Sequence, residues 1–193
     1  MKFASFDPDS TWDPKSSFVE YLNNHPQESN IINQFIELIN SQDRCFYRDL
    51  FTPGHFTSSA WVVSNCGKFA LMAHHKKLDK WLQLGGHADG DSNLLRSACR
   101  EVEEEGGITP ESVLCHDKKP ILFDIDLHDI PAFGDELAHK HFDCRFLFKV
   151  DKNLKITCSD ESNDLRWIAV EQMYQYTKEP SILRMVEKLA LFF

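Results

Sequence analysis

Residues 86–108 read GHADGDSNLLRSACREVEEEGGI, and this segment constrains the architecture of the chain more than any other. It predicts a helix from about Ser92 to Glu105, because the glycine pair that follows is typical of a helix C-terminus. With about 100° between successive residues, apolar side chains gather on one side of this helix. That side, which is expected to face the core, carries Leu95, Ala98, Cys99 and Val102.

Three glutamates gather on a neighbouring face of the same helix. Glu101, Glu104 and Glu105 are spaced i,i+3 and i,i+4, so their carboxylates converge, whereas Glu103 points elsewhere. Each of the three opposes the negative end of the helix dipole, at a cost of about 0.3–1 kcal/mol. A divalent cation such as Mg²⁺, Mn²⁺ or Ca²⁺ would neutralise the cluster. The alternative is a solvated acidic helix end in an already acidic protein.

The same segment resembles a known family motif, the Nudix box. Residues 100–108 match its second half, R-E-U-x-E-E-x-G-U with U aliphatic, at every defined position, and Gly86 stands at the box glycine. The box has a glutamate six residues after that glycine, where this chain has Ser92. In the family that glutamate usually supports the loop and the box arginine. Its absence therefore bears on loop geometry more than on activity, and Asp89 or Asp91 is a candidate substitute.

The resemblance implies roles for the matching residues. Mg²⁺, with Mn²⁺ as a substitute, would bridge the protein and the substrate phosphates and lower the pKa of an attacking water. Arg100 would orient a box glutamate through a charge-assisted hydrogen bond. The implied catalytic residues are Glu104, Glu101 and Arg100, the implied metal ligands are Glu101, Glu104, Glu105 and the carbonyl of Gly85, and the implied substrate contacts are Gly86 and His87.

The general base is expected to be an acid. Some members of the family use a box glutamate, and others use an acid from a loop far along the chain. Glu136, in the loop before His139, is the candidate for such a distal acid. Asp135 competes with it, and both are equally compatible with a solvated loop.

The rest of the chain predicts a mixed α/β arrangement. Strands are expected over residues 57–64, 69–74, 121–130, 141–150 and 165–169, and helices over residues 16–22, 29–39, 170–176 and 180–191. The resemblance implies an α+β fold, an α/β/α sandwich in which helices flank a mixed β-sheet. We expect a Nudix domain over residues 51–193 and an N-terminal helical extension, residues 1–50, packed on it. The extension would either cap the cleft or form a homodimer interface.

Composition and charge limit the partners. The 193 residues are 42% hydrophobic and include 15 Phe, which is enough for a buried core. The net charge of −9 argues against nucleic acid and requires a cation beside any phosphorylated substrate. No apolar run reaches the ~18 residues of a membrane span, and the N-terminus lacks a signal peptide, so a soluble cytoplasmic protein is expected. The six cysteines stand singly and are expected to be buried and reduced.

Histidines gather along the predicted strands. His128 shares an alternating face with Asp124 and Asp126, and His139 and His141 flank the next strand. These positions predict either a metal or phosphate site or ordinary polar positions at the border of a cleft.

The resemblance implies hydrolysis of a diphosphate linkage in a nucleoside diphosphate linked to another moiety. One alternative on the same fold is an isopentenyl diphosphate isomerase, which needs a Cys and a Glu in settings that are not found around Cys66 or Cys99. Another is a catalytically weak domain that binds a nucleotide as a sensor. Sensors commonly lose box glutamates, and this chain retains three; Ser92 keeps the sensor alternative open.

Overall fold

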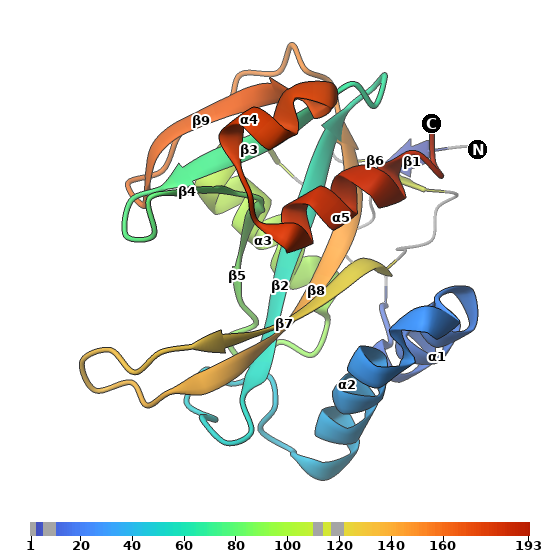
Figure 1. Cartoon of the computed structure of the whole chain (residues 1–193), viewed down its shortest axis with the longest axis vertical. Coiled ribbons are helices and arrows are strands. Elements are labelled where there is room, and N and C mark those ends of the chain that lie inside the picture. The colour runs from blue at the N-terminus through green and yellow to red at the C-terminus, as the bar shows by residue number, and fades with distance from the viewer. Residues whose placement is uncertain (1–2, 6–10, 110–113, 117–121) are drawn as a thin grey trace.

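A mixed β-sheet forms the centre of the molecule (Figure 1). The computed structural model describes residues 3–5, 11–109, 114–116 and 122–193. The sheet has nine strands in this part of the chain. They are β1 (Phe3–Ser5), β2 (His55–Ser64), β3 (Phe69–His75), β4 (Lys80–Leu82), β5 (Leu84–His87), β6 (Leu114–His116), β7 (Leu122–Ile130), β8 (His139–Val150) and β9 (Ser162–Ala169).

Two long parallel strands hold the sheet together. β2 pairs with β8 over its whole length, from His55 opposite His141 to Ser64 opposite Val150. β7 runs antiparallel along the other edge of β8, so that the two form a long hairpin. β5 pairs with the first half of β2, whereas β3 joins β2 only at Val63. This arrangement brings β5, β7 and the starts of β2 and β8 to one end of the sheet.

Helices cover both faces of the sheet, which is the α/β/α sandwich expected from the sequence. The helices are α1 (Pro14–Asn24), α2 (Ser29–Ser41), α3 (Leu94–Gly106), α4 (Met173–Tyr176) and α5 (Pro180–Leu189), with short 3-10 turns at Pro26–Glu28 and Val170–Gln172. Alternate residues of β2 face opposite cores: Val62 packs with the α1, α2 and α3 side chains, and Trp61 packs with those of α4 and α5. In Figure 1, α5 crosses in front of β2 and β8.

The central helix lies close to its predicted position. α3 runs from Leu94 to Gly106, and the four residues predicted to face the core are all buried. Its N-cap is Asn93, whose side chain accepts a hydrogen bond from the Arg96 N–H, so the predicted start at Ser92 was early. Gly107 ends the helix with a φ of +66°, a conformation that favours glycine.

The N-terminal helices share a core with the sheet. Phe18 of α1 and Phe35 of α2 pack on Phe56 of β2, with ring centroids 5.7 and 5.9 Å away. Phe35 also meets Phe142 of β8 at 5.3 Å. The helices α1 and α2 therefore pack on the sheet, while the division of the chain into an extension over residues 1–50 and a domain over residues 51–193 stays a prediction.

Two further findings concern membrane-spanning helices and the cysteines. Among the described residues, no helix combines the length and apolar character needed to cross a membrane. Cys45, Cys99 and Cys144 are buried thiols, whereas Cys66 and Cys158 are exposed, so the expectation of burial was wrong for these two. Both lie outside the helices and strands, where little packs over them. The side chain of Cys115 lies outside the described residues.

Candidate functional site

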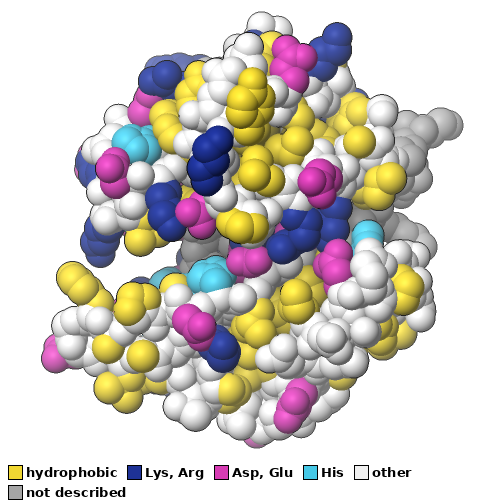
Figure 2. Space-filling model, viewed as in Figure 1, with side chains coloured by type: hydrophobic (Ala, Val, Ile, Leu, Met, Phe, Trp, Pro, Cys, Tyr) yellow, Lys and Arg dark blue, Asp and Glu magenta, His cyan; other side chains and the backbone are white. Residues whose placement is uncertain are grey.

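A cleft of about 280 Å³ opens between the β7–β8 hairpin and the turn from β3 to β4. Figure 2 shows this opening, with histidine side chains inside it. Three segments that are distant in sequence meet there. The box contributes Gly85, Gly86 and Glu105, the hairpin contributes His128 and His141, and the loop before β9 contributes Glu161.

Glu101 is held against the backbone at the back of the box. Its side chain is buried, and a Cβ added to Gly86 would lie 2.6 Å from its Oε2 atom, so the close approach requires a glycine. Arg100 holds the other oxygen, with Nη2 lying 3.0 Å from Oε1. The same Arg100 nitrogen donates to the carbonyl of His87 at 2.6 Å. This is the orienting contact that the resemblance implies for Arg100.

Glu105 faces the cleft from the next turn of α3. Its carboxylate accepts a hydrogen bond from the Gly85 N–H at 2.9 Å. Burial raises the pKa of Glu105 to about 8 and that of Glu101 to about 7, and the nearby charge of Glu104 adds to both increases. Glu104 itself is exposed.

This donor set fits a hard divalent cation. The two raised pKa values show that the negative charges of Glu101 and Glu105 are destabilised in the metal-free protein. A cation beside them removes that destabilisation, and carboxylate oxygens are the ligands that Mg²⁺ and Mn²⁺ prefer. The three glutamates therefore suit the metal that the sequence predicts.

The loop of residues 87–93, called the box loop below, is supported by substitutes for the missing glutamate. Ser92 is exposed, and Asp89 provides the carboxylate beside Arg100, with Oδ2 3.2 Å from Nη1. Asp91 instead pairs with Arg96 at 2.6 Å. Of the two candidate substitutes, Asp89 is the one that contacts the box arginine.

The N-terminal segment also supports the box loop, which sequence reasoning missed. The Gly90 N–H donates to the carbonyl of Phe46 at 2.8 Å. Gly90 has a φ of +87°, and a Cβ there would lie 2.8 Å from the ring of Tyr47. None of the described residues of α1 or α2 lines the cleft.

The predicted distal acid lies away from the cleft. Glu136 sits in the turn of the β7–β8 hairpin, half exposed, and pairs with Arg48 at 3.2 Å. Glu136 and Asp135 are not among the described residues that line the cleft, whereas Glu161 is. The charge of Glu161 also raises the pKa values of Glu101 and Glu105. In the sequence, Glu161 is recognisable only as an acidic residue in the loop before the last strand.

The predicted histidine face carries ion pairs at one end and imidazoles at the other, and the two are linked by His128, whose Nδ1 lies 3.0 Å from Asp126 Oδ2. Asp124 and Asp126 pair with Arg145 and Arg184 from β8 and α5, so they stabilise the fold instead of joining a metal site. At the other end of the same face lie five imidazoles from four strands or their ends: His55, His87, His128, His139 and His141. His87 lines the cleft next to Gly86, and the role of both as substrate contacts stays a prediction.

Solved structures share this fold. A C. elegans Ap4A hydrolase in a binary complex superposes with a TM-score of 0.57 at 17% identity, covering 71% of this chain and 96% of that one. A NUDIX family hydrolase from Clostridium perfringens gives 0.56 at 22% identity, covering 72% and 98%. The E. coli dihydroneopterin triphosphate pyrophosphohydrolase gives 0.56 at 16% identity, covering 72% and 96%. At these identities the likeness shows the fold.

The family is shown by a direct match of the sequence. No curated protein matches the chain. The NUDIX domain profile, in contrast, matches residues 55–189, which begin at β2 and end with α5. The match includes the glutamate helix, the glycine pair and every strand that borders the cleft. With its glutamates, glycines and arginine placed as described, the chain belongs to the Nudix family of pyrophosphohydrolases.

Proposed function

We propose that the chain hydrolyses a diphosphate linkage in a small nucleotide-like substrate and that the reaction depends on Mg²⁺ or Mn²⁺. The observation that carries the proposal is a pair of neighbouring carboxylates on α3, the buried Glu101 and the half-buried Glu105, the second of which lines an open cleft. A protein of net charge −9 would repel phosphates unless a cation neutralised these groups.

The cation site would consist of Glu101, Glu104 and Glu105, with the carbonyl of Gly85 as a further ligand. When bound, the metal supplies neutralisation of phosphate charge and acidification of water. The protein supplies the position of the ligands. Arg100 fixes Glu101 by a bond at 3.0 Å, and the Gly85 N–H fixes Glu105 by a bond at 2.9 Å.

Glu161 is our preferred general base. It lines the cleft together with Glu105, and its charge acts on both Glu101 and Glu105. Glu136 remains the alternative taken from sequence, and its partner in this structure is Arg48.

The shape of the cleft favours a substrate with two different ends. Glu105 and the backbone of Gly86 give the cleft polar groups that suit phosphates, whereas Leu78 and Leu82 on one side and Ile130 on the other add apolar side chains. A flat or apolar group attached to a diphosphate would satisfy both, as a nucleoside does.

The two alternative functions are less well supported. An isomerase would need a cysteine at the cleft, but Cys99 lies in the core and Cys66 is exposed outside the strands. A pure sensor would not need three converging box glutamates, and Asp89 supplies the carboxylate that Ser92 lacks. Both observations favour a hydrolase.

The test is release of phosphate or pyrophosphate from a panel of nucleoside diphosphate derivatives, with and without Mg²⁺. Glu104→Gln should lower kcat/KM by more than the ~10–100-fold that loss of an outer-shell partner costs. Glu103→Gln is the matched control, because Glu103 is exposed on the same helix and points away from the cluster. Nucleotide binding without turnover of any compound by the folded wild type would favour the sensor instead.

A further inference from the structure

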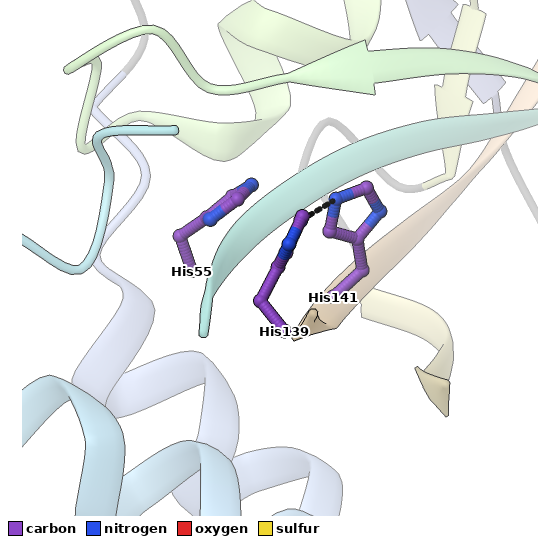
Figure 3. Close-up of side chains that lie close together, drawn as sticks. All are labelled: His55, His139 and His141. Carbon is purple, nitrogen blue, oxygen red and sulfur yellow. Dashed lines mark hydrogen bonds between the residues drawn. The ribbon is translucent and has the colours of Figure 1, made fainter. Parts of the chain in front are cut away.

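Three histidines converge where β2 and β8 begin (Figure 3). His55 lies directly opposite His141 in the parallel pairing, and His139 stands two residues before His141 on the same face. One ring nitrogen of each lies within 4.8 Å of the others. The Nε2 atoms of His139 and His141 are 3.2 Å apart. The ligand atoms of the three rings therefore lie close together, with the rings of His55 and His139 stacked at an interplanar angle of 27°.

Backbone carbonyls fix the tautomers of two of these rings. Nδ1 of His55 lies 3.1 Å from the carbonyl of Leu50, and Nδ1 of His139 lies 2.7 Å from the carbonyl of Leu137. A carbonyl only accepts, so each Nδ1 carries the proton and each Nε2 presents a lone pair. This is the arrangement by which proteins orient histidine ligands toward a metal.

One of the lone pairs has nothing to bind. His55 is 1% exposed, and its Nε2 atom has no hydrogen-bond partner among the residues that the structure describes. Buried polar atoms are almost always paired, so an orphan inside a ring of histidines needs an occupant. A cation among the three ligand atoms would satisfy it.

We propose that His55, His139 and His141 form a binding site for a divalent transition-metal cation of the zinc class, distinct from the carboxylate site of the box. Imidazole nitrogens suit such cations, whereas Mg²⁺ prefers oxygen ligands. Two ligands at the usual zinc–nitrogen distance lie about 3.4 Å apart in a tetrahedral site. The 3.2 Å between His139 and His141 is close to that separation, and the ligand atom of His55 lies within 4.8 Å of both, so its ring would move toward them on ligation.

An anion fits the same centre poorly. The fixed lone pairs would face a phosphate and repel it, because an anion requires N–H donors. Burial, followed by the neighbouring imidazoles, lowers the pKa of His141, and burial lowers that of His55. Metal ligation requires the neutral ring, so the surroundings favour the form that binds a cation.

The site borders the cleft without belonging to the box. His141 lines the cleft, so a cation held by the three rings has one side turned toward it. His87 and His128 are the nearest further ligands, with ring centroids 5.2 and 5.4 Å from that of His141. The inference does not depend on hydrolysis, because it follows from the three rings alone.

The experiment measures Zn²⁺ binding to the full chain after removal of metals with a chelator. Calorimetry is done in excess Mg²⁺, which occupies the carboxylate site. We expect one equivalent of Zn²⁺ per chain and a loss of at least 100-fold in affinity in His139→Gln and in His141→Gln. His74→Gln is the matched control, since His74 pairs with Asp79 and stacks on Trp81. Glu101→Gln should leave the zinc affinity unchanged.

The result that overturns the site is equal zinc affinity in the wild type and in both histidine variants. If Glu101→Gln lost zinc binding and the histidine variants kept it, the ion would lie at the box, and the three-histidine site would also be overturned. X-ray absorption of the wild type loaded with one equivalent of Co²⁺ covers the case of a variant that does not fold. Scattering from three imidazoles is the expected result, and a shell of oxygens alone contradicts the proposal. Neither readout uses turnover, so a failed hydrolase assay leaves the test intact.

Discussion

Arg100 shows how a single residue organises the site. It contacts the Glu101 carboxylate, the His87 carbonyl and the Asp89 carboxylate at 2.6–3.2 Å, and thereby joins α3 to the box loop. Asp89 reaches it from a left-handed backbone conformation, with a φ of +51°, which Asp tolerates better than most residues. Arg100 needs a carboxylate partner. That carboxylate can come from either of two positions in the loop: the box glutamate position, where this chain has Ser92, or Asp89.

The distal acid gives the prediction at this scale. Glu161→Gln should lower kcat by about 10²–10⁴-fold, the usual contribution of a general base, with little change in folding. Glu136→Gln is the matched variant, and its kcat should equal that of the wild type because its partner is Arg48 outside the cleft. Steady-state kinetics over the pH range separates the two. If kcat fell in Glu136→Gln and stayed at the wild-type value in Glu161→Gln, Glu136 would be the general base and Glu161 would have no part in the mechanism.

Residues within the motif were predictable, and residues that reach the site from elsewhere were not. The box itself supplied Glu101, Glu105 and Arg100, because their spacing on one helix sets their positions. His55 is brought to the site by the pairing of β2 with β8, and Glu161 by the pairing of β9 with β3. Each pairing joins segments about ninety residues apart in the chain. Local spacing carries no information about such pairing. The acids named from the sequence, Glu136 and Asp135, therefore do not include Glu161, and the identity of the general base stays a prediction.

At the scale of the element, α3 is stabilised at its start and destabilised at its end. Asn93 caps the first turn, and apolar residues bury one side. The last turn carries Glu104 and Glu105 with no basic residue to balance the dipole. The sequence predicted this conflict, because charge and spacing are local. It could not predict the depth of burial of Glu101 and Glu105, which comes from β5 and the glycines against which they pack.

The pH dependence of stability follows from that burial. The folded-state pKa values, about 7 for Glu101 and about 8 for Glu105, exceed the ordinary value of 4.5. The unfolded chain therefore binds fewer protons, and stability falls as pH rises through 7 and 8. The window to examine is pH 6.5 to 8.5, where the lowered pKa values of His55, His87 and His141 keep these rings mostly neutral in the folded state. The same histidines lose protons near pH 6.5 in the unfolded chain, which offsets part of the fall in stability at the lower end of the window.

Thermal unfolding of the metal-free protein should show a Tm that drops by several degrees across this window. Added Mg²⁺ should raise the Tm more at pH 8.5 than at pH 6.5, because a cation binds only the deprotonated carboxylates. The double variant Glu101→Gln, Glu105→Gln should lose both effects, and Glu103→Gln should keep both. A wild-type Tm that stays level while the double variant shows the same profile would contradict the buried charges as the cause.

At the scale of the whole molecule, the N-terminal helices and the sheet form one structure. Trp12, Phe18 and Phe35 lie in the core that also contains the apolar face of α3. Lys188 of α5 reaches across the edge of the sheet to Glu28 and Asp124, each at 2.7 Å. The box loop rests on the same N-terminal segment. A homodimer stays a prediction.

This continuity predicts that the extension and the Nudix domain unfold together. Phe18→Ala should lower the free energy of unfolding by about 3–5 kcal/mol, the cost of emptying a buried aromatic site. Val19→Ala, one residue along the same helix and 53% exposed at that position, should stay within about 0.5 kcal/mol of the wild type. Urea titrations followed by tryptophan fluorescence and by circular dichroism should give one coincident transition for each protein. An early transition that removes α1 and α2 while turnover persists would show instead that the extension folds by itself, and that the box loop does not need Phe46 beneath it.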